Sequence, residues 1–333
     1  MISRQVCTIA LVVVALVFGF LNGFQNSANI VATMISSRAL RPRWALLLSA
    51  LAHFCAPFIF GVAVATTIGR DVVNPQTITV SVVMAAAFSA IIWNLITWFF
   101  GLPSSSTHAL VAGIVGAVTV AAGFDAIQRD GLLKVIFALA FSPLLGLIFG
   151  YLGMKLILFL ARGASPRINW FFKRAQVLTA VGLALSQGTN DAQKTMGILA
   201  MGLVAGGVLP DFAVPWWVVA LSAAAISLGI ASGGWRIIKT LGARLYRLRP
   251  VDGFVSQGSS ATVILGAALL GGPVSATQVV SSSIMGTGSA QRVSMVRWGV
   301  VGEILAAWVL TIPISALGAA LLYYPINYLL GGI

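Results

Sequence analysis

Three polar side chains interrupt a long apolar stretch in the second half of the chain, and their spacing brings them together. Asn190, Asp191 and Lys194 stand at positions i, i+1 and i+4, which are neighbouring positions on one side of a helix. The same spacing recurs in the first half in Gln25, Asn26 and Asn29. Amides, a carboxylate and an ammonium group in this arrangement predict a polar site for an ion or an anion. The alternative is an Asp191–Lys194 pair that only ties helices together.

Two runs of small hydroxyl residues follow prolines and are typical of helix starts. Pro103 precedes one run and Pro273 the other, and proline and serine are both common where a helix begins. Hydroxyls and free backbone amides at two such starts would also suit a tetrahedral oxyanion, which accepts hydrogen bonds from every side. The candidate hydroxyl ligands are Ser105, Ser106, Thr107, Ser275 and Thr277. His108, which ends the first run, is a candidate proton carrier or a hydrogen-bonded structural histidine.

The elements that must position these groups are membrane helices. Of the 333 residues, 59% are apolar and 8% are charged, and the mean hydropathy is +1.00. Soluble domains average about 25% charged residues. Twenty basic and seven acidic side chains cannot cover the surface of a soluble protein this long. This excludes a soluble enzyme, a secreted disulfide scaffold and a disordered chain. The net charge of +13 does not indicate a nucleic-acid partner, because the basic residues form short clusters between apolar runs.

Ten apolar segments approach the roughly 20 residues that one helical span requires. They fall into two sets of five: 6–35, 44–68, 77–100, 106–123 and 132–160, then 175–206, 214–231, 254–271, 275–288 and 296–329. A charge at the centre of a membrane helix costs at least about 2.5–3.5 kcal/mol, so Asp191 and Lys194 are expected to face protein rather than lipid. Segments 106–123 and 275–288 are short and rich in serine and glycine, which leaves open whether they cross the membrane or re-enter.

The two sets of five are related by matched motifs. Gly23–Asn29 aligns with Gly188–Lys194, and Leu102–His108 aligns with Gly272–Gln278, at separations of 80 and 85 residues. An odd number of crossings in each set would make the second copy enter the membrane from the opposite side. The prediction is an all-α, polytopic membrane protein with two inverted five-segment repeats. Gly23 and Gly188 are expected to break their helices just before each polar trio.

Basic clusters suggest the domain organisation and the topology. We expect a first transmembrane repeat at 1–161, a cytoplasmic basic connector at 162–174 and a second repeat at 175–333. The clusters follow the first, fifth, seventh and ninth segments, so all four can lie in the cytoplasm with both termini outside. Within the second repeat, 232–252 is predicted to be a cytoplasmic amphipathic basic loop, with one interfacial helix over 235–249.

At the polar motifs the chain resembles the inorganic phosphate transporter family, which includes low-affinity permeases of bacteria. Gly188–Gly197 is similar to the second family signature, and Asn22–Thr33 followed by Ser37–Leu40 is similar to the first. Gly101–Leu110 and Gly272–Gln278 are similar to the paired hairpin motifs, and the resemblance covers essentially the whole chain. It implies a multi-pass protein of the bacterial inner membrane that takes up phosphate, driven by protons or sodium. It implies neither enzyme activity nor a bound cofactor or metal.

The resemblance also assigns roles to the polar residues. The anion site would be lined by Gln25, Asn26, Asn29, Ser105, Ser106, Thr107, Asn190, Lys194, Ser275 and Thr277. Asp191 would hold the coupling cation or proton, with Asn26 and His108 as further coupling candidates, and Lys194 would offset substrate charge. The chain departs from the family at Asn26, where the first signature usually has an acid, and at Gln25, Gln187 and Gln278. Because asparagine carries no charge, Asp191 is the one remaining signature acid.

Three other functions stay open at this point. The first is a permease for sulfate or another oxyanion, and the second is an uncoupled or non-transporting relative. The third is an intramembrane hydrolase that uses Ser106, His108 and Asp191, although an enzyme has no reason to duplicate half of its site. The expected partners are inorganic phosphate and the lipid bilayer, and a homodimer is left open.

Overall fold

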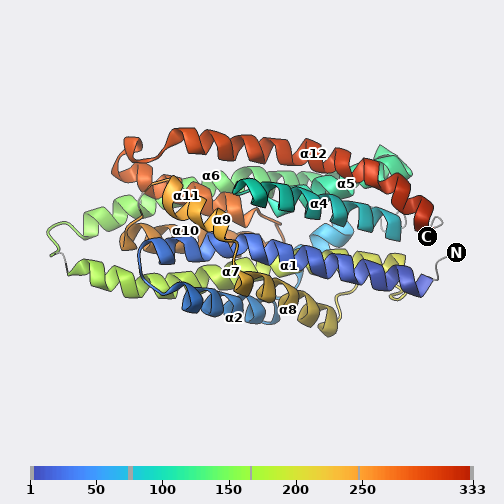
Figure 1. Cartoon of the computed structure of the whole chain (residues 1–333), viewed down its shortest axis with the longest axis horizontal. Helices are drawn as coiled ribbons and strands as arrows, with labels where there is room; N and C mark the ends of the chain where they lie inside the picture. The colour runs from blue at the N-terminus through green and yellow to red at the C-terminus, as the bar shows by residue number, and fades with distance from the viewer. Residues whose placement is uncertain (1–3, 74–77, 166, 247, 331–333) are drawn as a thin grey trace.

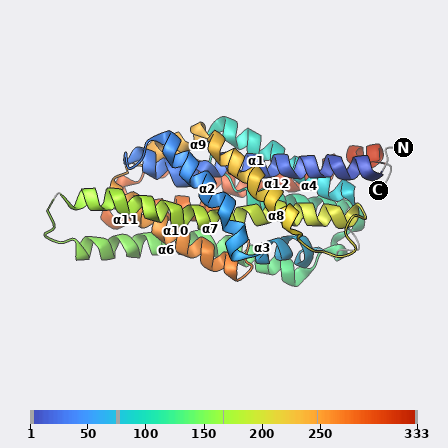
Figure 2. The same cartoon turned by 90° about the horizontal axis from the view of Figure 1, so that it is seen from below.

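The computed structural model describes residues 4–73, 78–165, 167–246 and 248–330, and in them the chain forms an elongated bundle of helices (Figures 1 and 2). The helices of the first half are α1 (Arg4–Ser36), α2 (Pro42–Phe60), α3 (Ala63–Thr66), α4 (Val80–Phe100), α5 (Ser106–Ala122) and α6 (Arg129–Leu160). Those of the second half are α7 (Ile168–Ala205), α8 (Trp216–Ser232), α9 (Trp235–Lys239), α10 (Pro250–Leu269), α11 (Ala276–Gln291) and α12 (Trp298–Leu330). Four short pieces of other helix types accompany them: the π-helices η1 (Thr67–Asp71) and η4 (Thr240–Arg244), and the 3₁₀-helices η3 (Phe124–Ala126) and η5 (Val293–Met295). The described residues form no strand, which confirms the all-α fold.

Each of the ten predicted segments coincides with a helix to within several residues, apart from the last part of 44–68. The first residue of segment 77–100 lies outside the described residues. Five described helices are long and apolar enough to cross a membrane: α1, α2, α4, α6 and α12. The bent pair α8 and α9 makes a sixth if it is counted as one span. The polar signature divides the apolar part of α7, which is the longest helix at 38 residues.

The helices do not break at the glycines where a break was predicted. α1 runs without interruption through Gly23, and α7 runs through Gly188. A Cβ atom at Gly23 would lie 2.0 Å from the carbonyl oxygen of Ile226 on α8, and one at Gly188 would lie 2.8 Å from the Cα atom of His53 on α2. The prediction was therefore wrong. These glycines allow close approach of neighbouring helices, and the intact helical hydrogen bonds leave no free backbone groups there.

Breaks do occur, one helix later in each half. α2 ends at Phe60 and is followed by Gly61, whose φ of +79° suits glycine, and α3 begins after Val62. α8 ends at Gly233 with a φ of +70°, and α9 continues at an angle of 58° to it. The freed ends are bonded by the signature helices. Gln193 Oε1 on α7 accepts from the amide of Val64 at 2.6 Å, and Ser27 Oγ on α1 accepts from the amide of Gly234 at 2.9 Å.

The two halves pack against each other in matching pairs. α1 contacts α8 while α7 contacts α2, and α6 contacts α11 while α12 contacts α5. Within the halves, α1 contacts α4 and α7 contacts α10. Figure 1 shows α1 beginning and α12 ending at one end of the bundle, with the α6–α7 connection at the opposite end. The packing is that expected of a repeat, and the inverted orientation of the second copy stays a prediction, as do the domain boundaries.

The loop over 232–252 differs from the predicted interfacial helix. α9 and η4 form two short pieces, and Arg247 lies outside the described residues. Ile237, Ile238 and Leu241 are buried, and α9 and η4 both contact α1. These three side chains therefore pack on protein instead of lipid, because the bend at Gly233 turns α9 against the end of α1.

Replacing Gly23 by alanine is expected to destabilise the protein, because the new methyl group would meet the Ile226 carbonyl oxygen. Overpacking typically costs about 1–3 kcal/mol, which corresponds to a loss of roughly 5 °C in Tm for a chain of this size. Gly182→Ala on α7 is the matched control, since no atom lies within 4 Å of its Cβ position. Thermal unfolding of the detergent-solubilised variants measures the difference. Equal Tm values for the two would contradict the close helix contact.

Candidate functional site

The polar trios of the two halves meet in the interior of the bundle. α1 and α7 pack together, and Asn26 Nδ2 donates to Asp191 Oδ2 at 2.7 Å. On α7 itself, Lys194 Nζ lies 2.5 Å from Asp191 Oδ1 and Asn190 Nδ2 lies 3.1 Å from the same oxygen. The Asp191 carboxylate therefore accepts from three side chains, one of them contributed by the other half of the chain.

The Asp191–Lys194 pair is fully enclosed. Its side chains are 0% and 1% exposed. Such a pair gains little net stability, because the loss of hydration offsets much of the attraction between the charges. The residue types thus fit a polar site better than a structural tie.

A second polar set surrounds Asn26 on the side of α11. Thr277 Oγ1 donates to Asn26 Oδ1 at 3.0 Å, and Asn29 Nδ2 lies 3.2 Å from Thr277 Oγ1 and 3.3 Å from Asn26 Oδ1. On the other side, Asn22 Oδ1 accepts from Asn26 Nδ2 at 2.8 Å and from Ser106 Oγ at 2.6 Å. Asn26 thereby connects Asp191 to a hydroxyl from each hairpin motif.

The tips of the two hairpins touch each other beside this network. Thr107 Oγ1 donates to the carbonyl oxygen of Val274 at 3.0 Å. Asn190 bonds both backbone groups of Val274, donating to its oxygen at 3.0 Å and accepting from its amide at 3.2 Å. The serines before each helix act as N-caps: Ser105 accepts from the His108 amide and Ser275 from the Gln278 amide. The predicted capping role is confirmed, and α5 and α11 both begin at the polar site.

Most of the predicted site residues come together, and two, Gln25 and His108, lie aside. Gln25 projects the other way and donates to the carbonyl oxygen of Asn94 on α4. His108 is half-buried, and its Nδ1 atom lies 2.7 Å from Ser105 Oγ. Because Ser106 donates to Asn22, the described bonds do not include the Ser106–His108 pair that the hydrolase alternative requires.

Asn22 is a site residue that the sequence reasoning did not include. It lies four residues before Asn26 on the same side of α1, is fully buried and bonds both Asn26 and Ser106. Its position at i−4 was a usable signal, because residues four apart on a helix are neighbours. His53 lies in the second apolar segment, where the sequence predicts a packed histidine, and in the structure it is fully buried.

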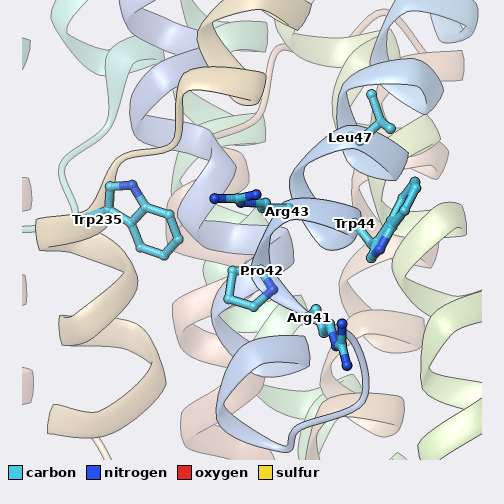
Figure 3. Close-up of a pocket in the computed structure, with 6 residues that line it drawn as sticks. All are labelled: Arg41, Pro42, Arg43, Trp44, Leu47 and Trp235. Atoms are coloured by element: carbon cyan, nitrogen blue, oxygen red, sulfur yellow. The ribbon is translucent and has the colours of Figure 1, made fainter.

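A large hollow lies elsewhere, where α2 begins near α9 (Figure 3). It has a volume of about 740 Å³, and the side chains that line it include Arg41, Arg43, Trp44 and Trp235. Figure 3 shows the Arg43 guanidinium directed toward Trp235. Arginine and tryptophan at a helix end are typical of the boundary between membrane and water. None of the networked polar residues lines this hollow, so the candidate substrate site is the closed polar interior.

In this bundle of membrane helices, two polar helices and two hairpin tips, one of each from either half of the chain, enclose a buried site. This is the arrangement of a polytopic membrane transporter. Residues 22–319 match the model of the phosphate transporter family. The chain is 43% identical over 318 residues to a probable low-affinity inorganic phosphate transporter of Rhizobium meliloti (strain 1021), with 95% of each chain covered. It is 41% identical over 326 residues to a protein of the same description from Bacillus subtilis (strain 168), with 97% of this chain and 98% of the relative covered.

A solved structure agrees with the sequence comparison. The chain superposes with a TM-score of 0.89 and 25% identity on a structure described as the sodium-dependent phosphate transporter, covering 97% of this chain and 99% of the other. The chain therefore belongs to the phosphate transporter family and is a multi-pass membrane protein. Its relatives are named as transporters and not as enzymes, which confirms the resemblance and removes the hydrolase alternative.

Proposed function

We propose that this protein is a secondary transporter that moves inorganic phosphate across the membrane together with protons or sodium ions. One observation carries this proposal: amides, hydroxyls and one lysine from both halves of the chain converge on a single buried site. A tetrahedral oxyanion accepts hydrogen bonds, and the donors here are the side chains of Asn26, Thr277, Asn190 and Lys194. The names of the relatives support phosphate as the substrate.

Lys194 is the cationic group of the site, and phosphate would compete with Asp191 for it. In the present structure Lys194 is bonded to Asp191, and the site is closed on all sides by buried residues. Entry of phosphate therefore requires the helices or the hairpin tips to separate. The starts of α5 and α11 carry further donors. They are the free backbone amides of the first turns and the hydroxyls of Ser106, Thr107, Ser275 and Thr277.

A co-transported cation follows from the electrostatics of uptake. Carrying one negative charge inward against the membrane potential costs about 2.3 kcal/mol per 100 mV. Asp191 is the acid of the network and the candidate for holding that cation. Asn26 stands next to it as a neutral donor.

Uptake of labelled phosphate into proteoliposomes tests the function. We expect accumulation only when an inward proton or sodium gradient is imposed, with little competition from excess unlabelled sulfate. Abolition of uptake by sulfate would reassign the substrate to another oxyanion. Equilibration without a dependence on either gradient would contradict the coupling. No phosphate movement by folded protein under any gradient would contradict the proposed function.

A further inference from the structure

His53 is a buried titratable group that the phosphate site described above does not use. It lies on α2 and is 0% exposed. Its Nδ1 atom lies 3.1 Å from the carbonyl oxygen of Ser49, so Nδ1 must carry the hydrogen of that bond. The other ring nitrogen, Nε2, is buried without a hydrogen-bond partner. The neutral ring therefore presents a free lone pair to the protein interior.

The surroundings of His53 contain further unsatisfied polar groups. Pro57, four residues later in α2, has no amide hydrogen for the His53 carbonyl oxygen, so the helix omits one bond there. Across the contact lies Gly188 of α7, and the preceding residue, Gln187, is fully buried with both side-chain polar atoms unpartnered. Unpaired buried groups are costly and rare in folded proteins. The unpartnered atoms of His53 on α2 and Gln187 on α7 point to a polar species that these two packed helices hold in part of the transport cycle.

Among the described residues, Asp191 on α7 is the charged group that acts on the His53 ring. α2 packs against α1, α7 and α8. α8 has no charged residue, and the one charge of α1 is Arg4, at its far end. On α7, Asp191 acts electrostatically on the His53 ring, and Lys194 is bonded to Asp191. Burial disfavours the charged imidazolium, and an Asp191 carboxylate that Lys194 no longer neutralises would oppose that effect.

We propose that, when the co-transported ion is a proton, His53 binds it in place of Asp191, and that phosphate controls this binding by drawing Lys194 away from Asp191. This assignment rests on the proposed function. When the anion occupies the site, Lys194 turns to it, and the freed Asp191 carboxylate stabilises the imidazolium form of His53. The proton comes from water and adds to Nε2, and no bond is broken in the protein. Phosphate and proton then bind cooperatively, and linkage requires that each raises the affinity for the other.

The same scheme explains how the chain retains a proton site with Asn26 in the first signature. Asparagine cannot accept a proton at physiological pH, and Asp191 already accepts bonds from three donors. Histidine is the side chain whose ordinary titration lies nearest neutral pH. A proton on His53 also offsets the charge of the incoming anion within the closed interior.

His53→Gln separates proton coupling from substrate binding. Glutamine can still donate to the Ser49 carbonyl oxygen but does not titrate. In proteoliposomes, we expect accumulation driven by a proton gradient to fall by at least about tenfold. Exchange of internal for external phosphate needs no net proton movement, so at saturating phosphate, where a lower affinity has no effect on the rate, it should remain as in the unmodified protein. Phe54→Leu is the matched control, because the neighbouring side chain on α2 is 40% exposed and should leave both assays unchanged.

A second measurement uses the unmodified protein and does not depend on the folding of a variant. Addition of phosphate to the detergent-solubilised protein in weak buffer should cause net proton uptake, read with a pH-sensitive dye. Absence of proton uptake would overturn the assignment, as would retention of gradient-driven accumulation or parallel loss of exchange in His53→Gln. Sodium-driven uptake that is indifferent to pH in the unmodified protein would overturn the His53 assignment alone. Absence of all phosphate uptake would overturn the proposed function as well.

Discussion

Replacing Lys194 by methionine is expected to abolish phosphate uptake and to destabilise the protein strongly. Lys194 Nζ lies 2.5 Å from Asp191 Oδ1, and both side chains are enclosed. Methionine would fill much of the same volume but would leave the Asp191 carboxylate buried without its cation. Removing one partner of a buried ion pair costs about 3–5 kcal/mol, a large part of the stability of a typical domain. Thermal unfolding in detergent and uptake in proteoliposomes measure the two effects separately.

The double variant Lys194→Met with Asp191→Asn is the control for charge. It removes both charges together, and replacing a whole buried pair by neutral residues is often close to neutral for stability. We therefore expect the double variant to recover most of the lost Tm while uptake stays absent, because the cationic anion ligand and the acid are both gone. Recovery of uptake in the double variant would show that the pair is a structural tie. An unchanged Tm in the single variant would contradict the observed ion pair.

The helical fold was predictable because the same physical requirement applies to every long apolar segment of the sequence. Long apolar runs must form helices, because the bilayer offers no partner for free backbone groups. The positions of the helix breaks were not predictable by the same reasoning. Gly23 and Gly188 lower helix propensity, but close packing against Ile226 and His53 uses them inside continuous helices. Helix propensity is a property of one segment. Whether the helix breaks at a glycine is decided by packing against residues that are distant in sequence.

The site was predictable to the extent that the repeat could be recognised. Aligning the two trios places Asn26 opposite Asp191 across 165 residues of sequence, and the structure brings them into contact. Gln25 was grouped with Asn26 because they are adjacent, yet one residue turns a helix by 100°, so Gln25 faces α4. His53 belongs to no repeated motif. Its place beside α7 follows only from the crossing of two helices at Gly188.

Replacing Asn26 by aspartate is expected to make uptake depend strongly on sodium or on low pH. Asn26 Nδ2 now donates to Asp191 Oδ2 at 2.7 Å, so a carboxylate at position 26 would set two acceptor oxygens against each other. Two carboxylates at such a distance do not both remain ionised unless a cation lies between them. At neutral pH without sodium we expect uptake to fall by about tenfold or more, and sodium or acidification should restore it.

Asn26→Ala separates the added charge from the lost hydrogen bonds. Alanine removes the donor to Asp191 and the acceptor of Thr277 without adding a second acid. It should therefore lower uptake at every sodium concentration and pH by a similar factor. If Asn26→Asp behaved like Asn26→Ala, the two positions would not share a cation during transport, and Asp191 would act alone. If only the aspartate variant acquired the cation dependence, the natural asparagine would be the reason that this chain manages with a single signature acid, with Lys194 supplying the charge that neutralises it.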